Sequence, residues 1–346
     1  MRKFHQIQLL LLFVCGAGLP ALAQESTDAP ETDASPPVLT VYTYDSFASD
    51  WGPGPKVEEA FEAVCECDLS FVSVDSSTGI LSRVQLEGDT SPADVVLGLD
   101  NSQVVEALNT GLIAPHEVDV PALDLPGDWD DAHFLPFDFG FFAFIYDETR
   151  MQDPPDSFEA LLQADDSMKI VIQDPRSSTP GLGLLLWVKA LYNDQAGAAW
   201  KRLAPKILTV TKGWSEAYGM FLEEEADMVL SYTTSPAYHQ VAENETKYRA
   251  AAFEEGHGMQ VEVAGMLKNA PNPDLARRFL GFILTPAFQS LIPTGNWMYP
   301  VAFPEEGLPD AFNTLVRPSR ALSINAQGVT DNRLDWIDEF NQALSQ

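Results

Sequence analysis

The chain has 346 residues, 45% of them hydrophobic, and its formal net charge at pH 7 is −31. This length and apolar share suit two domains of ordinary size, each with its own core. So acidic a chain repels nucleic acid phosphates and anionic lipid surfaces, so we expect no nucleic acid partner and no membrane insertion. Acidic runs such as 223–225 are typical of solvated surface, so the charge does not identify a ligand.

The N-terminus has the features of an export signal. Arg2 and Lys3 precede an apolar run over 9–19, and small residues flank a cleavage point after Ala23. The run is too short for a membrane span. We therefore expect a signal peptide over 1–23 and, because 24–37 lacks apolar periodicity, a flexible acidic leader over 24–37.

The following segments alternate between strand and helix patterns. Strands are predicted at 38–44, 69–74 and 93–98, and helices at 57–64 and 80–86. This order is typical of a parallel sheet covered by helices. Cys65 and Cys67 follow the first helix; they either form a small-ring disulfide or remain thiols, and their spacing does not suit zinc.

A long aromatic segment at 136–146 is too continuous for a surface strand and suits a crossing between two lobes. A second α/β lobe follows, with a return strand at 261–266 and mostly helical structure after it. We expect lobe 1 over 38–138 and 262–346 and lobe 2 over 139–261, joined by two crossings. The remaining predicted strands are 169–173, 208–211 and 227–232, and the helices are 157–164, 182–192, 215–223, 273–284 and 333–344.

Aromatic side chains recur where strands end, and ligands of open α/β sheets bind at these exits. A single Trp or Tyr more often only packs, but six at such positions in both lobes form a pattern. Converging aromatic faces suit a flat heteroaromatic cation. The six are Tyr44, Trp51, Trp214, Tyr232, Tyr238 and Trp297.

Polar groups accompany these aromatic residues. Ser178 and Thr179 open a long helix, where free backbone N–H groups can hold an anion such as a phosphate. Asp45 and Asp100 can accept hydrogen bonds from an amino-pyrimidine, or each can cap a helix.

The stretches 38–47, 93–101, 173–186, 210–218, 229–238 and 292–301 together resemble the periplasmic thiamine-binding proteins of bacterial ABC importers. The similarity runs from about Pro37 to about Phe303. It implies a class II periplasmic binding protein: two α/β lobes around a central cleft, rotating about crossing strands near Phe139 and Val263. It also implies a periplasmic monomer that takes thiamine or a thiamine phosphate to a permease and its ATPase, with no cofactor, metal or catalytic residue.

By this resemblance the six aromatic residues surround the pyrimidine and thiazolium rings. The hydroxyls of Ser178, Thr179 and the Thr233–Thr234–Ser235 turn correspond to the hydroxyethyl or phosphate end. Where close relatives have an Asp-Gly step, this chain has Ser76 and Ser77. Loss of that carboxylate predicts a preference for phosphorylated ligands, a hypothesis that equal affinities for thiamine and its phosphates would refute.

Three other roles stay open on the sequence. Thiamine-degrading enzymes resemble the same fold but use a cysteine nucleophile, and here the mature cysteines lie where a strand begins. Related ferric-ion binders use tyrosinates, and Tyr232, Tyr238, His239 and His257 are available. In that case the tryptophans would have no role. A purely structural or adhesive protein is a third possibility.

Overall fold

The computed structural model describes residues 35–345, and 36–345 lie in one compact unit. The predicted signal peptide and most of the leader lie outside the described residues. Within 35–345, no helix has the length and apolar character needed to cross a bilayer.

The first α/β segment has the predicted order. β1 (Val38–Tyr44), β2 (Asp68–Val74) and β3 (Val95–Asp100) are parallel, with β1 between the other two. α2 (Gly54–Cys65) and α3 (Ser77–Glu87) connect them, which confirms both predicted helices. Three short elements were not predicted: α1 (Asp45–Ala48), α4 (Val104–Asn109) and β4 (Ile113–Ala114).

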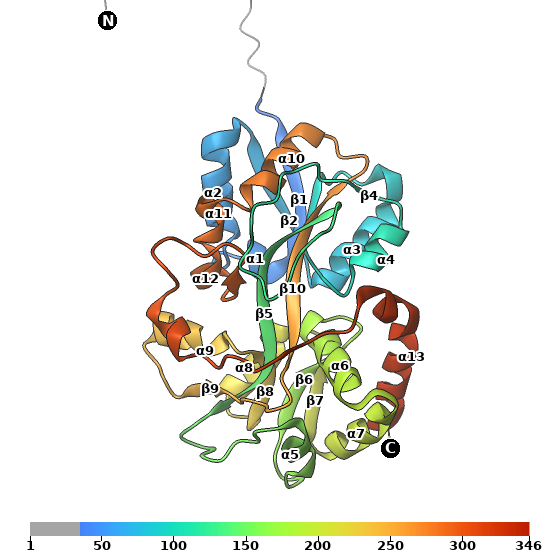
Figure 1. The fold of residues 1–346 in the computed structure, drawn as a ribbon, viewed down its shortest axis with the longest axis vertical. Coiled ribbons are helices and arrows are strands. Elements are labelled where there is room, and N and C mark those ends of the chain that lie inside the picture. The colour runs from blue at the N-terminus through green and yellow to red at the C-terminus, as the bar shows by residue number, and fades with distance from the viewer. Residues whose placement is uncertain (1–34, 346) are drawn as a thin grey trace, which may run out of the picture. The chain divides into compact units, whose positions relative to one another are not determined.

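Two long antiparallel strands run through the middle of the molecule (Figure 1). They are β5 (Phe134–Asp147) and β10 (His257–Leu267), and the sheet path is β2-β1-β3-β10-β5-β8-β6-β7. Thirteen of the fourteen β5 residues are buried. A strand covered on both faces reads as a continuous apolar run, which explains its aromatic sequence. The predicted crossing at 136–146 is confirmed.

The second α/β segment also follows the prediction, with β8 (Met228–Tyr232) and β7 (Ile207–Thr211) parallel to β6 (Ile170–Gln173). Its helices are α5 (Phe158–Gln163), α6 (Thr179–Tyr192), α7 (Ala196–Leu203), α8 (Trp214–Leu222) and α9 (Ser235–Tyr238), of which α7 and α9 were not predicted. The other elements are β9 (Tyr248–Ala250), α10 (Pro273–Phe282), α11 (Pro286–Gln289), α12 (Ile292–Gly295), β11 (Tyr299–Pro300), β12 (Ala321–Leu322) and α13 (Ala326–Leu344). Short 3₁₀ turns lie at Gly88–Thr90, Asn193–Gln195, Ala204–Lys206 and Asp310–Thr314, and a π-helical turn at His239–Glu243.

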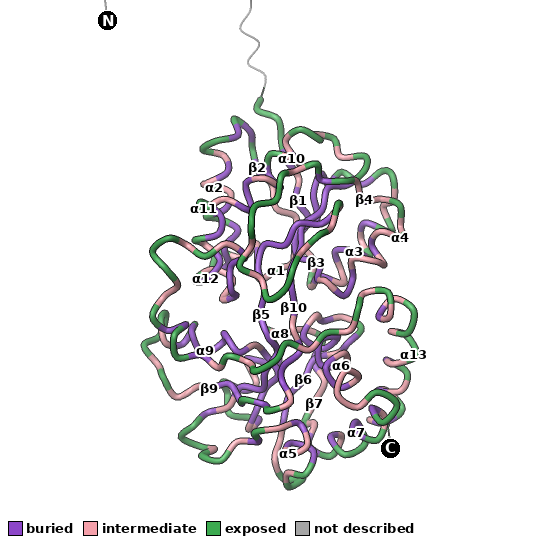
Figure 2. The backbone as a smooth tube through the Cα atoms, viewed as in Figure 1, coloured by how far each residue is buried: buried purple, intermediate pink, exposed green. Residues whose placement is uncertain are grey.

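Buried residues form one large core around β1, β3 and the first half of β5, and a second core under α6 and α7. Figure 2 shows the buried stretches along the backbone. Alternate residues of β5 enter different cores: Phe142 and Phe144 the second, Ala143 and Ile145 a third, smaller one. This is the two-residue period of a strand covered on both faces. Each half of β5 is therefore anchored in a different core.

The C-terminal helix α13 packs differently from the expected grouping of 262–346 with lobe 1. Its Phe340 meets Trp200 of α7 edge-on, with ring centroids 4.8 Å apart, and Ile337 also enters the second core. The unpredicted helix α7 supplies this apolar partner. We therefore propose that α13 belongs to the second lobe.

Candidate functional site

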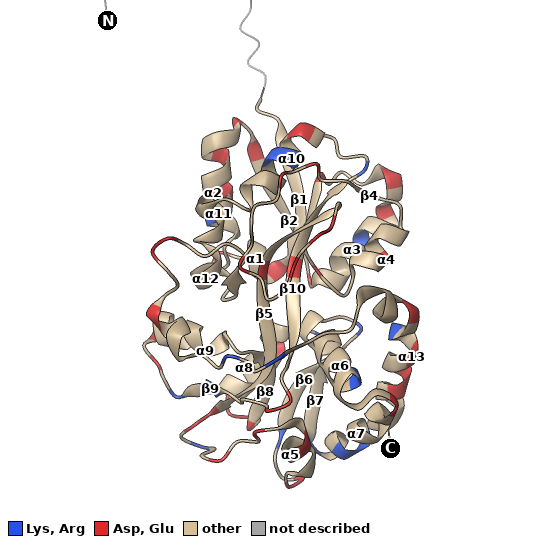
Figure 3. Ribbon diagram, in the orientation of Figure 1, with Lys and Arg blue, Asp and Glu red and all other residues tan. Residues whose placement is uncertain are grey.

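Three acidic residues lie side by side across the crossing strands. Glu262 of β10 is in register with Asp100 of β3 on one side and with Asp138 of β5 on the other. All three are buried, with 5%, 3% and 0% of the side chain exposed, respectively. Figure 3 shows acidic positions midway along β5 and β10, between the two lobes. The strand pairing thus brings three carboxyl groups together midway along the crossing strands.

Tyr44, a predicted site residue, and Asn296, the neighbour of Trp297, form hydrogen bonds with these acidic residues. The hydroxyl of Tyr44 donates to Glu262 Oε2 at 2.8 Å. Asn296 Nδ2 lies 2.6 Å from Asp138 Oδ2, 3.0 Å from Glu262 Oε2 and 3.0 Å from the Tyr44 hydroxyl. Asp138 and Glu262 face each other in the register of β5 and β10, so both carboxyl groups belong to this network. The exits of β1 and α12 therefore meet the crossing strands in one polar network.

Burial controls the protonation of this network, because a charged group loses solvation there. Burial raises the pKa of Glu262 to about 7, although hydrogen bonds from Asp138, Tyr44 and Asn296 oppose the rise. Burial and then the charge of Glu262 raise the pKa of Asp138 well above its usual range. The same two causes raise the pKa of Tyr44, so its hydroxyl stays a proton donor.

Sequence reasoning missed Asp138, Glu262 and Asn296. The available signal was a single carboxylate inside each of two apolar strands, 136–146 and 261–266. A charge in a buried strand is costly unless it is paired, and such positions often serve function. Asn296 had a weaker signal, its place beside Trp297.

Of the predicted residues of lobe 1, Tyr44 ends β1, Trp51 lies between α1 and α2, and Trp297 lies between α12 and β11. Tyr44 lies over Gly98, where any Cβ would approach a ring carbon of Tyr44 to 2.3 Å and where φ is +104°, so glycine is required. Trp297 has a left-handed backbone with φ of +56°. Trp51 is 59% exposed, and Asp45 is also exposed. Their roles in ligand binding stay predictions.

The predicted residues of lobe 2 form a chain of contacts behind the exits of β7 and β8. Trp214 stacks on Tyr218 with centroids 4.8 Å apart, and its Nε1 donates to Ser231 Oγ at 2.7 Å. Ser231 Oγ lies 2.7 Å from Ser235 Oγ. The Tyr232 hydroxyl donates to Gln260 of β10 at 2.9 Å. The indole of Trp214 and the turn after β8 are thus locked together.

Two hydroxyls of that turn have no partner. Thr233 and Thr234 are fully buried, and within residues 35–345 neither Oγ1 has a hydrogen-bond partner. Buried hydroxyls are normally satisfied, so an unpartnered pair is a reasonable place for a polar ligand group. Ser178 is buried too, and at the start of α6 its side chain makes no capping hydrogen bond.

Predicted residues from the two lobes also touch. The hydroxyl of Ser77 on α3 contacts that of Thr179 on α6. The rings of Tyr238 and Trp297 meet edge-on at 5.3 Å. The lobes are therefore in contact on both sides of the crossing strands.

The Ser76–Ser77 step lies next to an ionic contact that sequence reasoning overlooked. Ser76 caps α3, with its Oγ 3.4 Å from the Gly79 N–H. Asp75, one residue earlier, pairs with Lys212 of the opposite lobe. By the resemblance, this chain lacks the Asp of its close relatives at Ser76, but the carboxylate of Asp75 lies one residue away.

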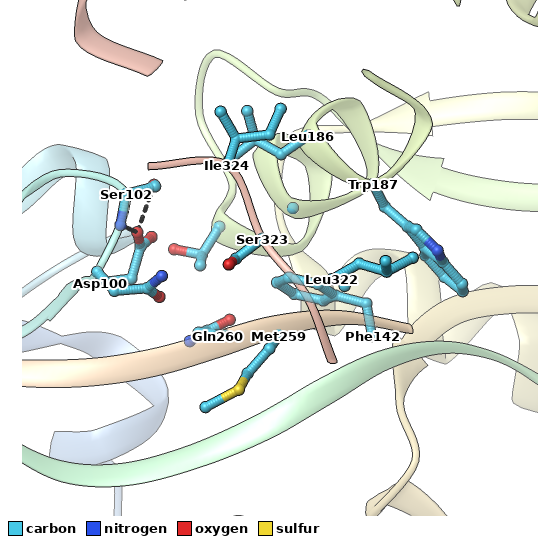
Figure 4. Close-up of a pocket in the computed structure, with 14 residues that line it drawn as sticks. Asp100, Ser102, Phe142, Leu186, Trp187, Met259, Gln260, Leu322, Ser323 and Ile324 are labelled. Atoms are coloured by element: carbon cyan, nitrogen blue, oxygen red, sulfur yellow. Dashed lines mark hydrogen bonds between the residues drawn. The ribbon is translucent and has the colours of Figure 1, made fainter. Parts of the chain in front are cut away.

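Asp100 has a local structural role in this conformation. Its Oδ1 accepts from the Ser102 N–H at 2.7 Å and from the Ser102 hydroxyl, which stabilises the turn before α4 (Figure 4). It also borders a cavity shared with Leu186, Trp187 and Ser323. The cavity measures about 20 Å³, room for roughly one water molecule. Of the predicted residues, Asp100 and Thr179 line it and the aromatic six do not.

The histidines of the ferric alternative are already engaged. His239 is buried, and its ring nitrogens lie 2.9 Å from the Tyr218 hydroxyl and 2.6 Å from a Glu243 carboxylate oxygen. Both ring nitrogens of His257 contact backbone groups, at 2.7 and 2.9 Å. Residues 35–345 contain no group of three or more His, Cys, Asp or Glu side chains arranged for a metal ion. Neither histidine is free to ligate iron.

Cys65 and Cys67 form a disulfide. It is buried between the end of α2 and the start of β2, with Glu66 between the cysteines in the left-handed conformation. This answers the question that the C-x-C spacing left open. In this state neither sulfur is a free thiolate, the form that attacks as a nucleophile.

Two α/β lobes joined by antiparallel crossing strands, with polar and aromatic side chains from both lobes at the crossing, define a class II solute-binding protein. Residues 54–290 match the family described as bacterial extracellular solute-binding protein, and the chain belongs to it.

Within this family the chain is similar over most of its length to two relatives of known name. It is 50% identical over 338 residues to the thiamine-binding periplasmic protein of Salmonella typhimurium strain LT2, covering 98% of both chains. It is 52% identical over 310 residues to the protein of the same name from Escherichia coli strain K12, covering 90% of this chain and 94% of that one.

Solved structures give the same picture. A periplasmic thiamin binding protein superposes with a TM-score of 0.87 at 52% identity, covering 90% of this chain and 97% of that chain. A ferric binding protein from Campylobacter jejuni superposes with a TM-score of 0.72 at 19% identity, which shows the shared fold alone.

Proposed function

We propose that this chain is the periplasmic solute-binding component of an ABC importer. It captures thiamine or a thiamine phosphate and delivers it to a membrane permease with its ATPase. The observation that carries the proposal is 50% identity over 98% of both chains to a protein named for thiamine binding. The strand-exit aromatic residues of both lobes support it independently, since they suit a flat cationic ring.

In the proposed site the heteroaromatic rings lie against the side chains of Tyr44, Trp214, Tyr232, Tyr238 and Trp297, with Trp51 closing from the rim. Stacking and cation–π contacts are each worth roughly 0.5–2 kcal/mol. The hydroxyethyl or phosphate end of the ligand would accept hydrogen bonds from the unpartnered hydroxyls of the turn after β8. Binding, not bond cleavage, is the whole task of these residues.

Capture is proposed to proceed by rotation of the lobes about β5 and β10. The interlobe contacts of Ser77 with Thr179 and of Asp75 with Lys212 would form on closure and break on opening. We further propose that residues 1–23 are removed on export and that the mature protein acts as a monomer.

Thermal-shift measurements with thiamine, its phosphates and a comparison ligand test this function. Thiamine and its mono- and diphosphate should each stabilise the protein, by about 2.7 kcal/mol at a ligand concentration of 100 Kd. Ferric ion with citrate is the comparison ligand. Stabilisation by iron together with a visible charge-transfer colour, and none by thiamine, would overturn the proposal. Thiamine recovered as cleaved products after incubation would instead indicate an enzyme.

A further inference from the structure

The buried carboxylates of Asp138 and Glu262, hereafter the acid pair, lack a basic partner. Within residues 35–345 neither forms a salt bridge to Lys, Arg or His, although each carboxylate is almost fully removed from water. Two buried like charges in contact are strongly unfavourable without a cation. The acid pair therefore requires either a proton or an external positive charge.

A second observation points the same way. Asp138 Oδ1 is buried and, in the described part of the chain, receives no N–H or O–H hydrogen bond. Its other oxygen already accepts from Asn296. A proton on one member of the acid pair would supply the missing hydrogen bond, and burial raises the pKa of Asp138 in that direction.

The groups packed around the acid pair add negative or neutral character. Tyr44 comes from β1, Asp100 from β3, Tyr232 from β8 and Asn296 from the residue after α12. The positive charge of Arg333 on α13 lowers the pKa of Asp100, which is not a member of the pair. The field at this point of the crossing strands is thus unbalanced and would attract a cation.

Three of these neighbours place the acid pair beside the proposed ligand. Tyr44 and Tyr232 belong to the aromatic six, and Asn296 precedes Trp297. We propose that the acid pair is the charge-selecting element of this cleft. When a cationic heteroaromatic ring binds, the pair releases a proton to the buffer. When a neutral ring occupies the cleft, the pair retains that proton. The inference rests on the proposed function and adds the means by which the site prefers a cation to a neutral isostere.

The sign of the pH effect follows from the free protein. Because the pKa of Glu262 is about 7, its carboxyl group is mostly protonated at pH 6 and mostly ionised at pH 8. A bound cation favours the ionised form, so affinity must rise with pH. For one coupled proton the increase from pH 6 to pH 8 is about threefold to tenfold.

The experiment is calorimetric titration of thiamine into the full protein at pH 7, in phosphate and in Tris, with Kd measured at pH 6 and 8. We expect the heat to differ between buffers by release of a fraction of a proton, and the affinity to rise as stated. A neutral thiophene isostere of the thiazolium should show neither effect. Glu262→Gln and Asp138→Asn should each reduce the pH ratio below about twofold, whereas Asp338→Asn, an exposed acid on α13, should leave it unchanged.

The outcomes separate cleanly. Thiamine binding with equal heats in both buffers and equal Kd at both pH values overturns the inference and leaves the proposed function standing. Proton release that persists in Glu262→Gln and Asp138→Asn overturns the assignment to the acid pair. Failure of folded wild-type protein to bind thiamine overturns the proposed function, and this inference with it.

Discussion

Replacement of Glu262 by glutamine should change how the stability of the ligand-free protein depends on pH. Burial raises the pKa of this carboxyl from 4.5 to about 7 in the folded protein. A raised pKa means that its contribution is fully present below the unfolded value and is lost as pH rises through the folded value. Between pH 5 and pH 8 that loss amounts to about 2–3 kcal/mol.

Glutamine keeps the size of the side chain and can still accept from Tyr44 and donate to Asp138, but it carries no charge. Relative to wild type, Glu262→Gln should therefore become more stable by about 2 kcal/mol as pH rises from 5 to 8. Urea unfolding at both pH values measures this, with Asp338→Asn as the exposed-acid control. If the free energies of unfolding of variant and wild type differ by the same amount at both pH values, Glu262 is not a buried carboxyl with a raised pKa.

Two further predictions concern the aromatic site and the disulfide. Trp214→Ala and Trp297→Ala should each weaken thiamine binding at least tenfold in a fluorescence titration without unfolding the protein, while Trp336→Phe, remote on α13, should not; unchanged affinity in both alanine variants would remove the cleft assignment. Replacing Cys65 and Cys67 together by serine should lower the free energy of unfolding by only about 1.5 kcal/mol, because the closed loop is so short, and urea unfolding showing a loss above about 4 kcal/mol would contradict this.

The regular elements were predictable because each carries a local pattern. The βαβαβ order from Val38 to Asp100 follows from alternating apolar periods, and β5 follows from an aromatic run too long for a surface strand. The short helix α7 was missed, although Ala196, Ala199, Trp200 and Leu203 recur at helical spacing and are buried. The place of α13 was missed with it, because its partner Trp200 lies on α7.

The site was predictable only in part. Aromatic residues near predicted strand exits stand out in sequence. The structure places Tyr44 and Tyr232 at the last residues of β1 and β8 and Trp214 just after β7, whereas Trp51, Tyr238 and Trp297 do not directly follow a strand. The acid pair does not stand out, because Asp138 and Glu262 are 124 positions apart and meet through the register of β5 and β10. Cross-strand register depends on the tertiary pairing of distant segments, which no local pattern contains. The Asp75–Lys212 contact depends likewise on the arrangement of the two lobes.

The most direct test is one calorimetric titration of thiamine into the mature wild-type protein at pH 7.5. The account predicts saturable binding of one thiamine per chain. No binding heat from protein shown to be folded, with thiamine in large excess over the protein, would contradict it.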